Sequence, residues 1–425
     1  MFYDYLAGMG IDPLVCDYVK TKDSEYSKQF AATNNIAAFN QLKVLNAMQD
    51  IRLSDAHFTD STGYGYSDIG RQALEDIFST IFKAEAALVR PQLISGTHAL
   101  AAALFGNLRP GDVLLSPVGR PYDTLESVIG IRPTSGSLAE YGVIYQQVQL
   151  TSDGGFDYNS IEKSLTNKPK MVTIQRSKGY SWRPSFTIKE IKQLITFIKT
   201  TSPHTIVLVD NCYGEFVEAE EPIEVGADII AGSLIKNPGG GIAPGGGYIA
   251  GAAKFVEAAA ERLTAPGLGS AVGPTFGMTR GLLQCLFMAP QAVGASVTGA
   301  ILAAASFEGL GYEVNPSPMA ARTDIVQAIK LGDAKKVLAY CKGIQRAAPV
   351  DSYVIPEPAP MPGYADGVVM AGGTFIQGSS IELSADAPMR DPYIVYHQGG
   401  ITTPHAKAGV VFALDALWRE GLVGL

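Results

Sequence analysis

Between residues 60 and 250, short apolar runs alternate with stretches of helical periodicity. The runs that we expect to form strands lie at residues 87–94, 113–116, 143–148, 171–175, 205–209 and 227–235. Runs without polar positions are typical of parallel strands that are covered by helices on both faces. Strands that alternate with helices along the chain predict βαβ units. The pattern therefore predicts an α/β fold with a mostly parallel sheet.

The pattern changes on either side of this region. Residues 34–50 have apolar positions at helical spacing, within an N-terminal stretch that otherwise reads as an extended arm. Residues 281–307 carry no charged side chain and contain Pro290. We interpret this run as a buried helix between two domains rather than as a membrane span.

The C-terminal part of the chain mixes both kinds of pattern. Helices are expected at 323–331 and 333–347, and strands at 367–370 and 380–383. We therefore divide the chain into an arm at 1–60, a large α/β domain at 61–295 and a small α+β domain at 296–425.

Composition narrows the class of protein. Of the 425 residues, 47% are hydrophobic and 17% are charged, which fits a Gly/Ala-rich α/β enzyme. The net charge of -8, without a basic stripe, argues against nucleic-acid binding. The four cysteines are widely spaced, which argues against a disulfide framework and against a metal site. The first ten residues lack the basic and apolar parts of a signal peptide, so we expect a cytoplasmic protein.

Lys236 is the first candidate for chemistry. It is the only charged residue between Asp228 and Lys254, and six glycines follow it between positions 239 and 247. A lysine among apolar neighbours loses hydration, so its neutral and nucleophilic form is favoured. Such an amine forms a Schiff base with a carbonyl compound. The alternative is a lysine that only extends from a strand end to the surface.

Asp210 is the second candidate, because it directly follows the apolar run 205–209. A carboxylate at the carboxyl end of a central parallel strand points into the crevice where α/β sheets bind ligands. A buried carboxylate also requires a cationic partner. The alternative is an aspartate that caps a turn.

Ser95, Gly96 and Thr97 lie between a predicted strand and a strongly helix-forming stretch, 99–108. A helix that starts after such a turn presents free backbone N–H groups to an anion, such as a phosphate. The alternative is a serine that caps the helix and does nothing more.

Taken together, these motifs resemble the fold-type I pyridoxal-phosphate enzymes. Asp210-Asn211 and the Ser-x-x-Lys of Ser233 and Lys236 are similar to the branch of cystathionine lyases and methionine γ-lyases. Within that branch the chain most resembles the methionine γ-lyase-like, or aluminium-resistance, proteins. The segments that carry this likeness are SGTHAL, GYSWRPS, SLIKNPGGGIAPGGGYIAG and GSSIELSADAP. The resemblance implies a pyridoxal 5'-phosphate cofactor and a fold-type I large domain with a smaller C-terminal domain.

The resemblance also implies a role for each cofactor residue. Lys236 would bind the cofactor as a Schiff base, and Asp210 would keep the ring nitrogen protonated. Phosphate would bind at a cup formed by the residues Ser95, Gly96, Thr97 and Ser233. Tyr122 would stack on the ring. Ser177, or Arg176 beside it, would hydrogen-bond the phenolic oxygen.

Two further roles are implied for substrate binding and catalysis. Tyr64 lies in a glycine-punctuated loop, 62–68, whose counterpart in the family reaches the site of a neighbouring subunit. Tyr64 would contact the cofactor phosphate of the neighbouring subunit and protonate the leaving group. Arg71 is the nearest candidate for the arginine that accompanies this tyrosine in the family. The alternative is that the loop serves only for packing. Glu382 stands where the family has its carboxylate-binding arginine, so Arg390 is the nearest replacement.

The implied function is a carbon–sulfur lyase that acts on a sulfur-containing amino acid, by methionine γ-lyase-like or cystathionine β-lyase-like elimination. An aminotransferase or an aldolase would use the same Lys236 and Asp210 chemistry, and a regulatory protein that only binds the cofactor is a third possibility. A nicotinamide-binding protein is disfavoured, because no G-x-G-x-x-G follows a first strand. The shared Tyr64 loop implies a homodimer or homotetramer.

Overall fold

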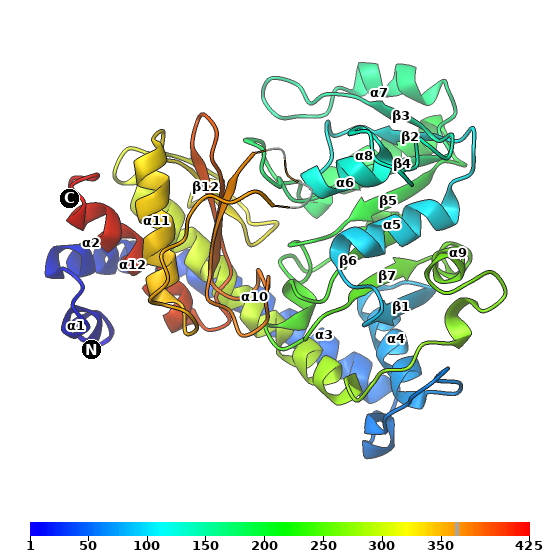
Figure 1. The fold of residues 1–425 in the computed structure, drawn as a ribbon, viewed down its shortest axis with the longest axis horizontal. Coiled ribbons are helices and arrows are strands. Elements are labelled where there is room, and N and C mark those ends of the chain that lie inside the picture. The colour runs from blue at the N-terminus through cyan, green and yellow to red at the C-terminus, as the bar shows by residue number, and fades with distance from the viewer. Residues whose placement is uncertain (362–363, 365) are drawn as a thin grey trace.

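The computed structural model describes residues 1–361, 364 and 366–425 (Figure 1). A seven-stranded sheet with the order β1-β7-β6-β5-β4-β2-β3 forms the core of the large domain. Its strands are β1 (Ala86–Arg90), β2 (Val113–Ser116), β3 (Ile144–Gln147), β4 (Met171–Gln175), β5 (Ile206–Asp210), β6 (Ile229–Ser233) and β7 (Gly247–Gly251). Strands β2 to β6 pair in parallel, whereas β7 runs antiparallel to both β6 and β1. The predicted α/β fold with a mostly parallel sheet is confirmed.

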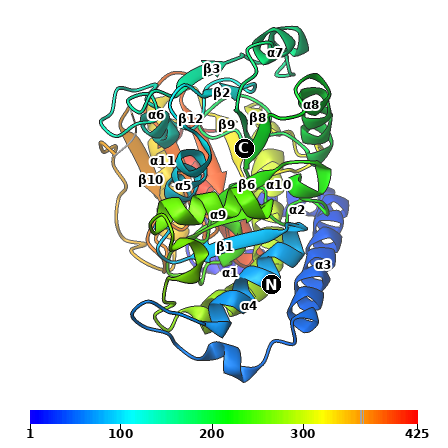
Figure 2. The same ribbon diagram turned by 90° about the vertical axis from the view of Figure 1, so that its right-hand side faces the viewer.

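Helices cover both faces of this sheet, as the fully apolar strands predict. The helices are α4 (Ile69–Phe82), α5 (Gly96–Asn107), α6 (Asp123–Ile129), α7 (Tyr158–Leu165), α8 (Ile188–Thr201) and α9 (Ala253–Leu263). Val207 and Val209 of β5 pack with α4, α7 and α8 on one face, while Leu208 packs with α5, α6 and α9 on the other. Figure 2 shows α5 and α9 on the same side of the sheet. Short 3-10 helices lie in the connections: η1 (Asp55–Phe58), η2 (Pro222–Val225), η3 (Asn237–Gly239) and η4 (Gly269–Ala271).

The small domain is built on a five-stranded antiparallel sheet with the order β10-β11-β12-β9-β8. Its elements are β8 (Glu313–Asn315), β9 (Gln327–Lys330), α11 (Ala334–Ala347), β10 (Val368–Ala371), β11 (Ser384–Pro388), β12 (Ile394–Gln398) and α12 (Thr403–Arg419). Figure 1 shows this domain at the left and the large sheet at the right.

Helix α10 (Thr279–Glu308) runs between the two domains (Figure 1). It is long and apolar enough to cross a membrane, yet 83% of its most apolar window is buried inside the protein. It is therefore a core helix, as predicted for residues 281–307. Because α10 is continuous, the expected domain boundary at 295/296 falls within a helix rather than in a linker.

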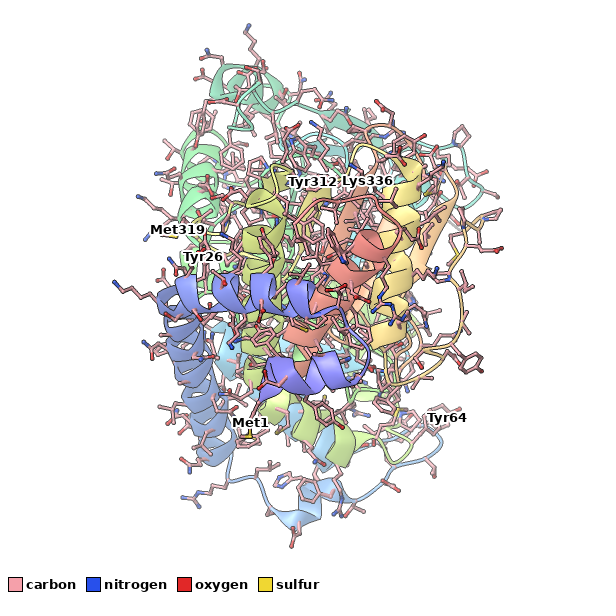
Figure 3. The ribbon with its side chains drawn as sticks, turned by 90° about the vertical axis from the view of Figure 1, so that its left-hand side faces the viewer. Met1, Tyr26, Tyr64, Tyr312, Met319 and Lys336 are labelled. Atoms are coloured by element: carbon pink, nitrogen blue, oxygen red, sulfur yellow. The ribbon has the colours of Figure 1, made fainter. Side chains whose placement is uncertain are left out.

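The N-terminal segment differs from the expected extended arm. It forms three helices, α1 (Phe2–Gly8), α2 (Pro13–Glu25) and α3 (Ser27–Asp50). Helices α2 and α3 pack on α10, α2 also packs on α12, and α1 packs on α2. Figure 3 shows them against the core, with Tyr26 where α2 passes into α3. The side chains of Val15, Val19 and Val44 are completely buried. Residues 34–50 do lie in a helix, as predicted, but the apolar side chains of Phe39, Leu42 and Leu45 are on its exposed side.

Two predictions for the small domain are wrong. Residues 323–331 do not form a helix; within them Gln327–Lys330 form strand β9, because Ala328 and Ile329 find apolar neighbours on opposite faces of the sheet. The strand expected at 380–383 begins only at Ser384. The Glu382 carboxylate accepts hydrogen bonds from the backbone N–H groups of Phe375 (2.8 Å) and Ile376 (3.0 Å), which holds that segment as a loop.

A buried ion pair ties α4 to β1. Glu75 Oε1 accepts from Arg90 Nε at 2.7 Å and from the N–H of Val89 at 3.0 Å. The Arg90 guanidinium also donates to the carbonyl of Val272 at 2.6 Å, in the segment that hydrogen-bonds to the Tyr64 loop. The pair therefore braces both the sheet edge and this loop.

We expect Glu75→Ala to lower the free energy of unfolding by about 3–5 kcal/mol, because it leaves the Arg90 charge buried without its partner. Equilibrium unfolding in urea measures the effect, with the exposed neighbour Asp76→Ala as the control. Equal stability of the two variants would contradict this role for the pair.

Candidate active site

The carboxyl ends of the large-domain strands meet the small domain at a cavity of about 770 Å³. The large domain contributes residues from the ends of β5 and β6 and from the starts of α5 and α6. The small domain contributes residues from β10, β11 and β12. Open α/β sheets bind ligands at this edge. Seven of the residues that we predicted to contact the cofactor line this cavity: Ser95, Gly96, Thr97, Tyr122, Asp210, Ser233 and Lys236.

Ser95, Gly96 and Thr97 form one corner of the cavity at the N-terminus of α5. Ser95 Oγ accepts from the N–H of His98 at 3.0 Å, so it caps the helix. A Cβ atom at Gly96 would stand 3.2 Å from both Cys212 Sγ and Ser233 Cβ, which is tighter than ordinary packing. Glycine therefore suits this position, and the N–H groups of Gly96 and Thr97 stay open to an anion.

Asp210 is the last residue of β5 and lines the cavity. Its Oδ1 accepts from the N–H of Cys212 at 3.1 Å. Burial raises the pKa of the Asp210 carboxyl, although the charge of Lys236 works against the increase. Such a carboxylate is stabilised by a cation in the cavity, which is the role expected of a ring nitrogen that carries a proton.

Lys236 follows β6 and extends into the same cavity. Its Nζ lies 4.0 Å from the centre of the Tyr213 ring. The backbone of Tyr213 is held in the left-handed region (φ 73°), and its carbonyl accepts from Asn237 Nδ2 at 2.9 Å. Tyr213 therefore provides a fixed aromatic face for the amine.

The electrostatics of Lys236 differ from the sequence-based expectation of a lowered pKa. Burial does act to lower the pKa of Lys236, but its coupling to the ionisable groups of Cys212, Tyr213, Asp210 and Glu215 outweighs burial, and the pKa lies above its usual value. The neighbours are acidic groups rather than the apolar side chains that the local sequence suggested. The Lys236 ammonium thus balances the charge of Asp210. A ligand that takes up the amine as a Schiff base and presents a ring cation to Asp210 would preserve that balance.

Tyr122 lines the cavity beside this pair. Its hydroxyl lies 2.6 Å from that of Tyr364, and its ring meets the ring of Tyr180 edge-on, with centroids 5.5 Å apart. An aromatic wall held from two sides suits a flat heteroaromatic ring.

Ser177 lies in a small adjoining recess with Asp210 and Lys236. Its hydroxyl donates to Asp324 Oδ2 at 2.7 Å. Gln175 shares this recess, and no sequence pattern had singled it out. The recess is the place where a phenolic oxygen next to Lys236 would find polar groups.

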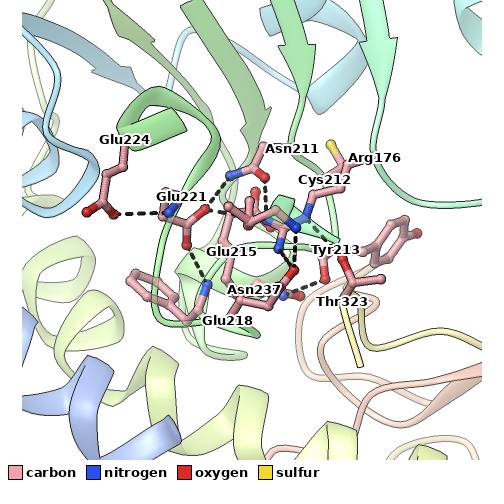
Figure 4. A network of polar contacts seen from close by, with 12 residues as sticks. Arg176, Asn211, Cys212, Tyr213, Glu215, Glu218, Glu221, Glu224, Asn237 and Thr323 are labelled. Atoms are coloured by element: carbon pink, nitrogen blue, oxygen red, sulfur yellow. Dashed lines mark hydrogen bonds and ion pairs between the residues drawn. The ribbon is translucent and has the colours of Figure 1, made fainter. Parts of the chain in front are cut away.

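Arg176, the alternative to Ser177, has no part in the cavity. Its buried guanidinium donates to Asn211 Oδ1 at 2.8 Å and to Glu218 Oε1 at 2.9 Å (Figure 4). Glu221 completes the network, since its Oε2 accepts from Asn211 Nδ2 at 3.0 Å. This network holds the turn that follows Asp210, so Arg176 supports the site from behind.

Tyr64 lies outside the cavity of its own chain. It is 67% exposed and stacks on Tyr66, with ring centroids 5.4 Å apart (Figure 3). The loop is rigid at its base, because Arg71 Nη1 donates to the carbonyls of Gly65 and Gly273, both at 2.7 Å. The Arg71 guanidinium therefore hydrogen-bonds backbone carbonyls at the base of the loop.

Arg390 also lies outside the main cavity. Its guanidinium pairs with Asp366 at 2.8 Å on the surface, in a shallow groove lined by Tyr180, Trp182 and Tyr396. Across the described part of the chain, Lys236 is the only lysine or arginine that lines the main cavity. A role for Arg390 in binding a substrate carboxylate therefore requires it to leave Asp366.

The pieces present fit pyridoxal 5'-phosphate. Four groups face one cavity: the N-terminus of α5 with Gly96, the buried Asp210 carboxylate, an aromatic wall and the primary amine of Lys236. These are the groups that would bind the phosphate, the ring nitrogen, the ring face and the aldehyde carbon.

Comparison with known proteins agrees with this assignment. The uncharacterized protein YnbB of Bacillus subtilis (strain 168) is 51% identical over 390 residues, covering 91% of this chain and 93% of YnbB. A carbon-sulfur lyase involved in aluminum resistance from Clostridium novyi NT is 50% identical, with a TM-score of 0.93 over 97% of this chain and 98% of that structure.

A more distant structure supports the fold alone. The pyridoxal-5'-phosphate dependent protein YhfS from Escherichia coli is 16% identical, with a TM-score of 0.58 over 90% of this chain and 96% of the other. The architecture is therefore that of the fold-type I pyridoxal-phosphate enzymes. The family model that matches residues 15–418 is described as methionine gamma-lyase. Because this match covers nearly the whole chain, the protein belongs to the methionine gamma-lyase family.

Proposed function

We propose that this protein is a pyridoxal-phosphate-dependent carbon–sulfur lyase, which removes a sulfur group from an amino acid by elimination. The observation that carries the proposal is the position of Lys236, which extends into a cavity beside Asp210 and the anion corner at Ser95. Membership of the methionine gamma-lyase family supports the type of bond that is broken.

The cofactor supplies an electron sink, which stabilises the carbanion formed at the substrate Cα atom. Backbone N–H groups of Gly96 and Thr97 would hold its phosphate, with Ser233 beside them. Asp210 would hold the proton on the ring nitrogen, Tyr122 would cover one ring face, and Ser177 or Gln175 would contact the phenolic oxygen.

Lys236 has a second role once the substrate amine has replaced it. Its Nζ, positioned over the Tyr213 ring, is placed to accept the α-proton as general base. The sulfur then leaves with the electrons of the carbon–sulfur bond and takes up a proton. The small domain lines part of the cavity with residues of β10, β11 and β12, which reduces the access of water to the reacting carbon.

The direct test is a panel of amino acids given to the holoenzyme. We expect thioether amino acids to yield equal amounts of thiol, ammonia and keto acid, measured by thiol reagent and by a coupled dehydrogenase. Transfer of the amino group to a keto acid, without thiol, would instead identify an aminotransferase. If no amino acid yields a product, the remaining interpretation is a regulatory protein that only binds the cofactor.

We further propose a homodimer or homotetramer that acts in the cytoplasm. Tyr64 and Tyr66 are exposed although both rings are large and partly apolar, and the base of their loop is braced. An exposed aromatic pair on a rigid loop is suited to a contact with a partner subunit. Four buried and unpaired cysteines fit a reducing compartment.

Mixing two inactive variants tests the shared site. If Tyr64 completes the site of its partner, Tyr64→Phe and Lys236→Ala damage different contributors to one site. Hybrid dimers then contain one intact site, and equal mixing should restore about a quarter of wild-type activity. Thiol release after confirmed subunit exchange provides the measurement, with each variant alone as the control. No recovery would place Tyr64 outside the partner's site.

A further inference from the structure

The small-domain half of the cavity is polar and acidic, and no cofactor contact explains it. Four side chains there define what we call the distal subsite: Tyr180, Ser384, Asp386 and Gln398. Ser384 and Asp386 belong to β11 and Gln398 belongs to β12, whereas Tyr180 approaches from the large domain.

The geometry of β11 directs this subsite into the cavity. Alternate residues of a strand point to opposite faces. Ala385 and Ala387 are completely buried in the core, so Ser384 and Asp386 are left to face the cavity. Pairing with β12 places Gln398 opposite Ser384. The carboxylate is therefore held by the sheet register and is not a surface group that happens to bend inward.

Asp386 lacks a cationic partner. Gln398 Nε2 donates to its Oδ2 at 3.0 Å, and no lysine or arginine among the described residues forms an ion pair with it. Burial raises the pKa of Asp386 to about 6, which still leaves it mainly ionised at neutral pH. A carboxylate in such a place is stabilised by a positive charge.

A hydroxyl group of the subsite also lacks a partner. Ser384 Oγ is buried, with no hydrogen bond to any described residue. The Tyr180 hydroxyl is buried as well and lies close to the Asp386 carboxylate, whose pKa it helps to lower. Buried polar atoms in native proteins are nearly always paired. Together with the Asp386 carboxylate, these hydroxyls offer acceptors from three side chains around one end of the cavity.

We infer that the distal subsite binds an ammonium group at the far end of the substrate. The substrate class is then a thioether amino acid whose leaving group itself carries an amine. An ammonium group has three N–H donors, which match the Asp386 carboxylate and the two hydroxyls. The α-carboxylate is excluded from this end, because it would face Asp386.

This inference rests on the proposed elimination and specifies its product. The α-proton passes to Lys236, the carbon–sulfur bond breaks, and the sulfur leaves with both electrons of that bond. After it takes up a proton, the leaving group is an aminothiol. Hydrolysis of the remaining fragment consumes water and yields a keto acid and ammonia.

A matched pair of substrates tests the subsite on the holoenzyme. S-(2-aminoethyl)-L-cysteine and S-propyl-L-cysteine have the same chain length and differ by an ammonium in place of a methyl group. We expect wild-type enzyme to favour the aminoethyl compound by about 10- to 100-fold in kcat/KM. Asp386→Asn should remove this preference through KM of the aminoethyl compound alone. If the enzyme cleaves only homocysteine derivatives, S-(2-aminoethyl)-L-homocysteine and S-propyl-L-homocysteine replace this pair of substrates.

Controls separate the subsite from a general defect. Asp76→Asn makes the same chemical change on the exposed face of α4 and should keep the preference. Asp386→Glu should restore part of it, because the charge returns in a displaced position. Unchanged cofactor absorbance in Asp386→Asn would show that the site near Lys236 is intact.

A binding measurement distinguishes failure of the subsite from failure of the proposed lyase activity. L-Lysine and L-2-aminoheptanoate are carbon analogues of the two substrates and cannot release thiol. Spectral titration should show about tenfold tighter binding of L-lysine to wild type, and no preference in Asp386→Asn. Preferential binding without thiol from any substrate would uphold the subsite and reject the lyase. Equal cleavage and equal binding within each pair would reject the subsite and leave the lyase standing.

Discussion

Lys236→Ala is expected to give a colourless protein with turnover at least about 1,000-fold below wild type, because one change removes both the covalent attachment and the general base. The amine of Lys236 is the only lysine or arginine group lining the cavity among the described residues. Its removal also leaves Asp210 without the nearby charge that lowers the pKa of that carboxyl. We therefore expect weaker binding of the cofactor as well as loss of the yellow colour after dialysis.

A second buried lysine makes this test discriminating. Lys178 is 1% exposed, and its Nζ has no hydrogen-bond partner among the described residues. Burial lowers the pKa of Lys178 to about 8, which is a property expected of a nucleophilic amine. It does not line the main cavity, however. The geometry thus favours Lys236, although the pKa alone would favour Lys178.

Borohydride reduction followed by peptide mapping decides between the two lysines. The expected adduct lies on the peptide that contains Lys236, and it is absent from Lys236→Ala. Lys178→Ala should still form it, and the exposed Lys254→Ala serves as a surface control. An adduct that persists in Lys236→Ala and disappears in Lys178→Ala would show that the cofactor is attached to Lys178 and that our assignment to Lys236 is wrong.

The large-domain half of the site can be predicted from sequence because each of its groups follows its own secondary-structure element. Asp210 ends an apolar run that is strand β5, and Ser95 precedes a helix that begins at the next residue. Parallel strands bring their carboxyl ends to one edge, so local patterns are enough to place these groups together. The capping box of α8 is a further example: the T-x-x-E pattern of Thr187 and Glu190 can be read in the sequence, because the motif depends only on neighbours in the chain.

The distal subsite could not be predicted in this way. Asp386 reaches the cavity only because β11 pairs with β12 and the small domain packs against the large one. The sequence SADAP around it alternates polar and apolar residues but contains no β-branched or aromatic residue, and the strand was expected four residues earlier. A substrate-binding arginine was therefore sought at Arg390, which pairs with Asp366 on the surface instead. Contacts between distant segments decide both outcomes.

The pKa of Lys236 shows the same limit. Its sequence neighbours are small and apolar, which suggested a lowered pKa. The residues that actually surround the amine include Asp210 at the end of β5 and Tyr213 in the turn after it, and both side chains are ionisable acids that raise the pKa of Lys236. The residues next to Lys236 in the sequence therefore predict the small size of its neighbours but not the electrostatic environment of its amine.

Asp210→Ala is expected to retain part of the cofactor and to lose about 100- to 10,000-fold in kcat, because nothing then keeps the ring nitrogen protonated. The attachment at Lys236 and the anion corner at Ser95 are not altered by this change, so binding should persist. Asp210→Asn is the matched variant: it keeps the size of the side chain and removes only the charge. Both variants should show similar losses if charge is what matters.

A cofactor analogue separates the electrostatic role of Asp210 from a structural one. Asp210 Oδ1 also accepts from the N–H of Cys212, so its loss could act by loosening the turn that carries Tyr213. An analogue methylated at the ring nitrogen stays positively charged without help from a carboxylate. Reconstitution of Asp210→Ala with this analogue should raise its thiol-releasing activity at least about tenfold over reconstitution with the natural cofactor. Wild-type rates in Asp210→Ala, or no gain from the analogue in either variant, would mean that Asp210 serves the turn rather than the ring.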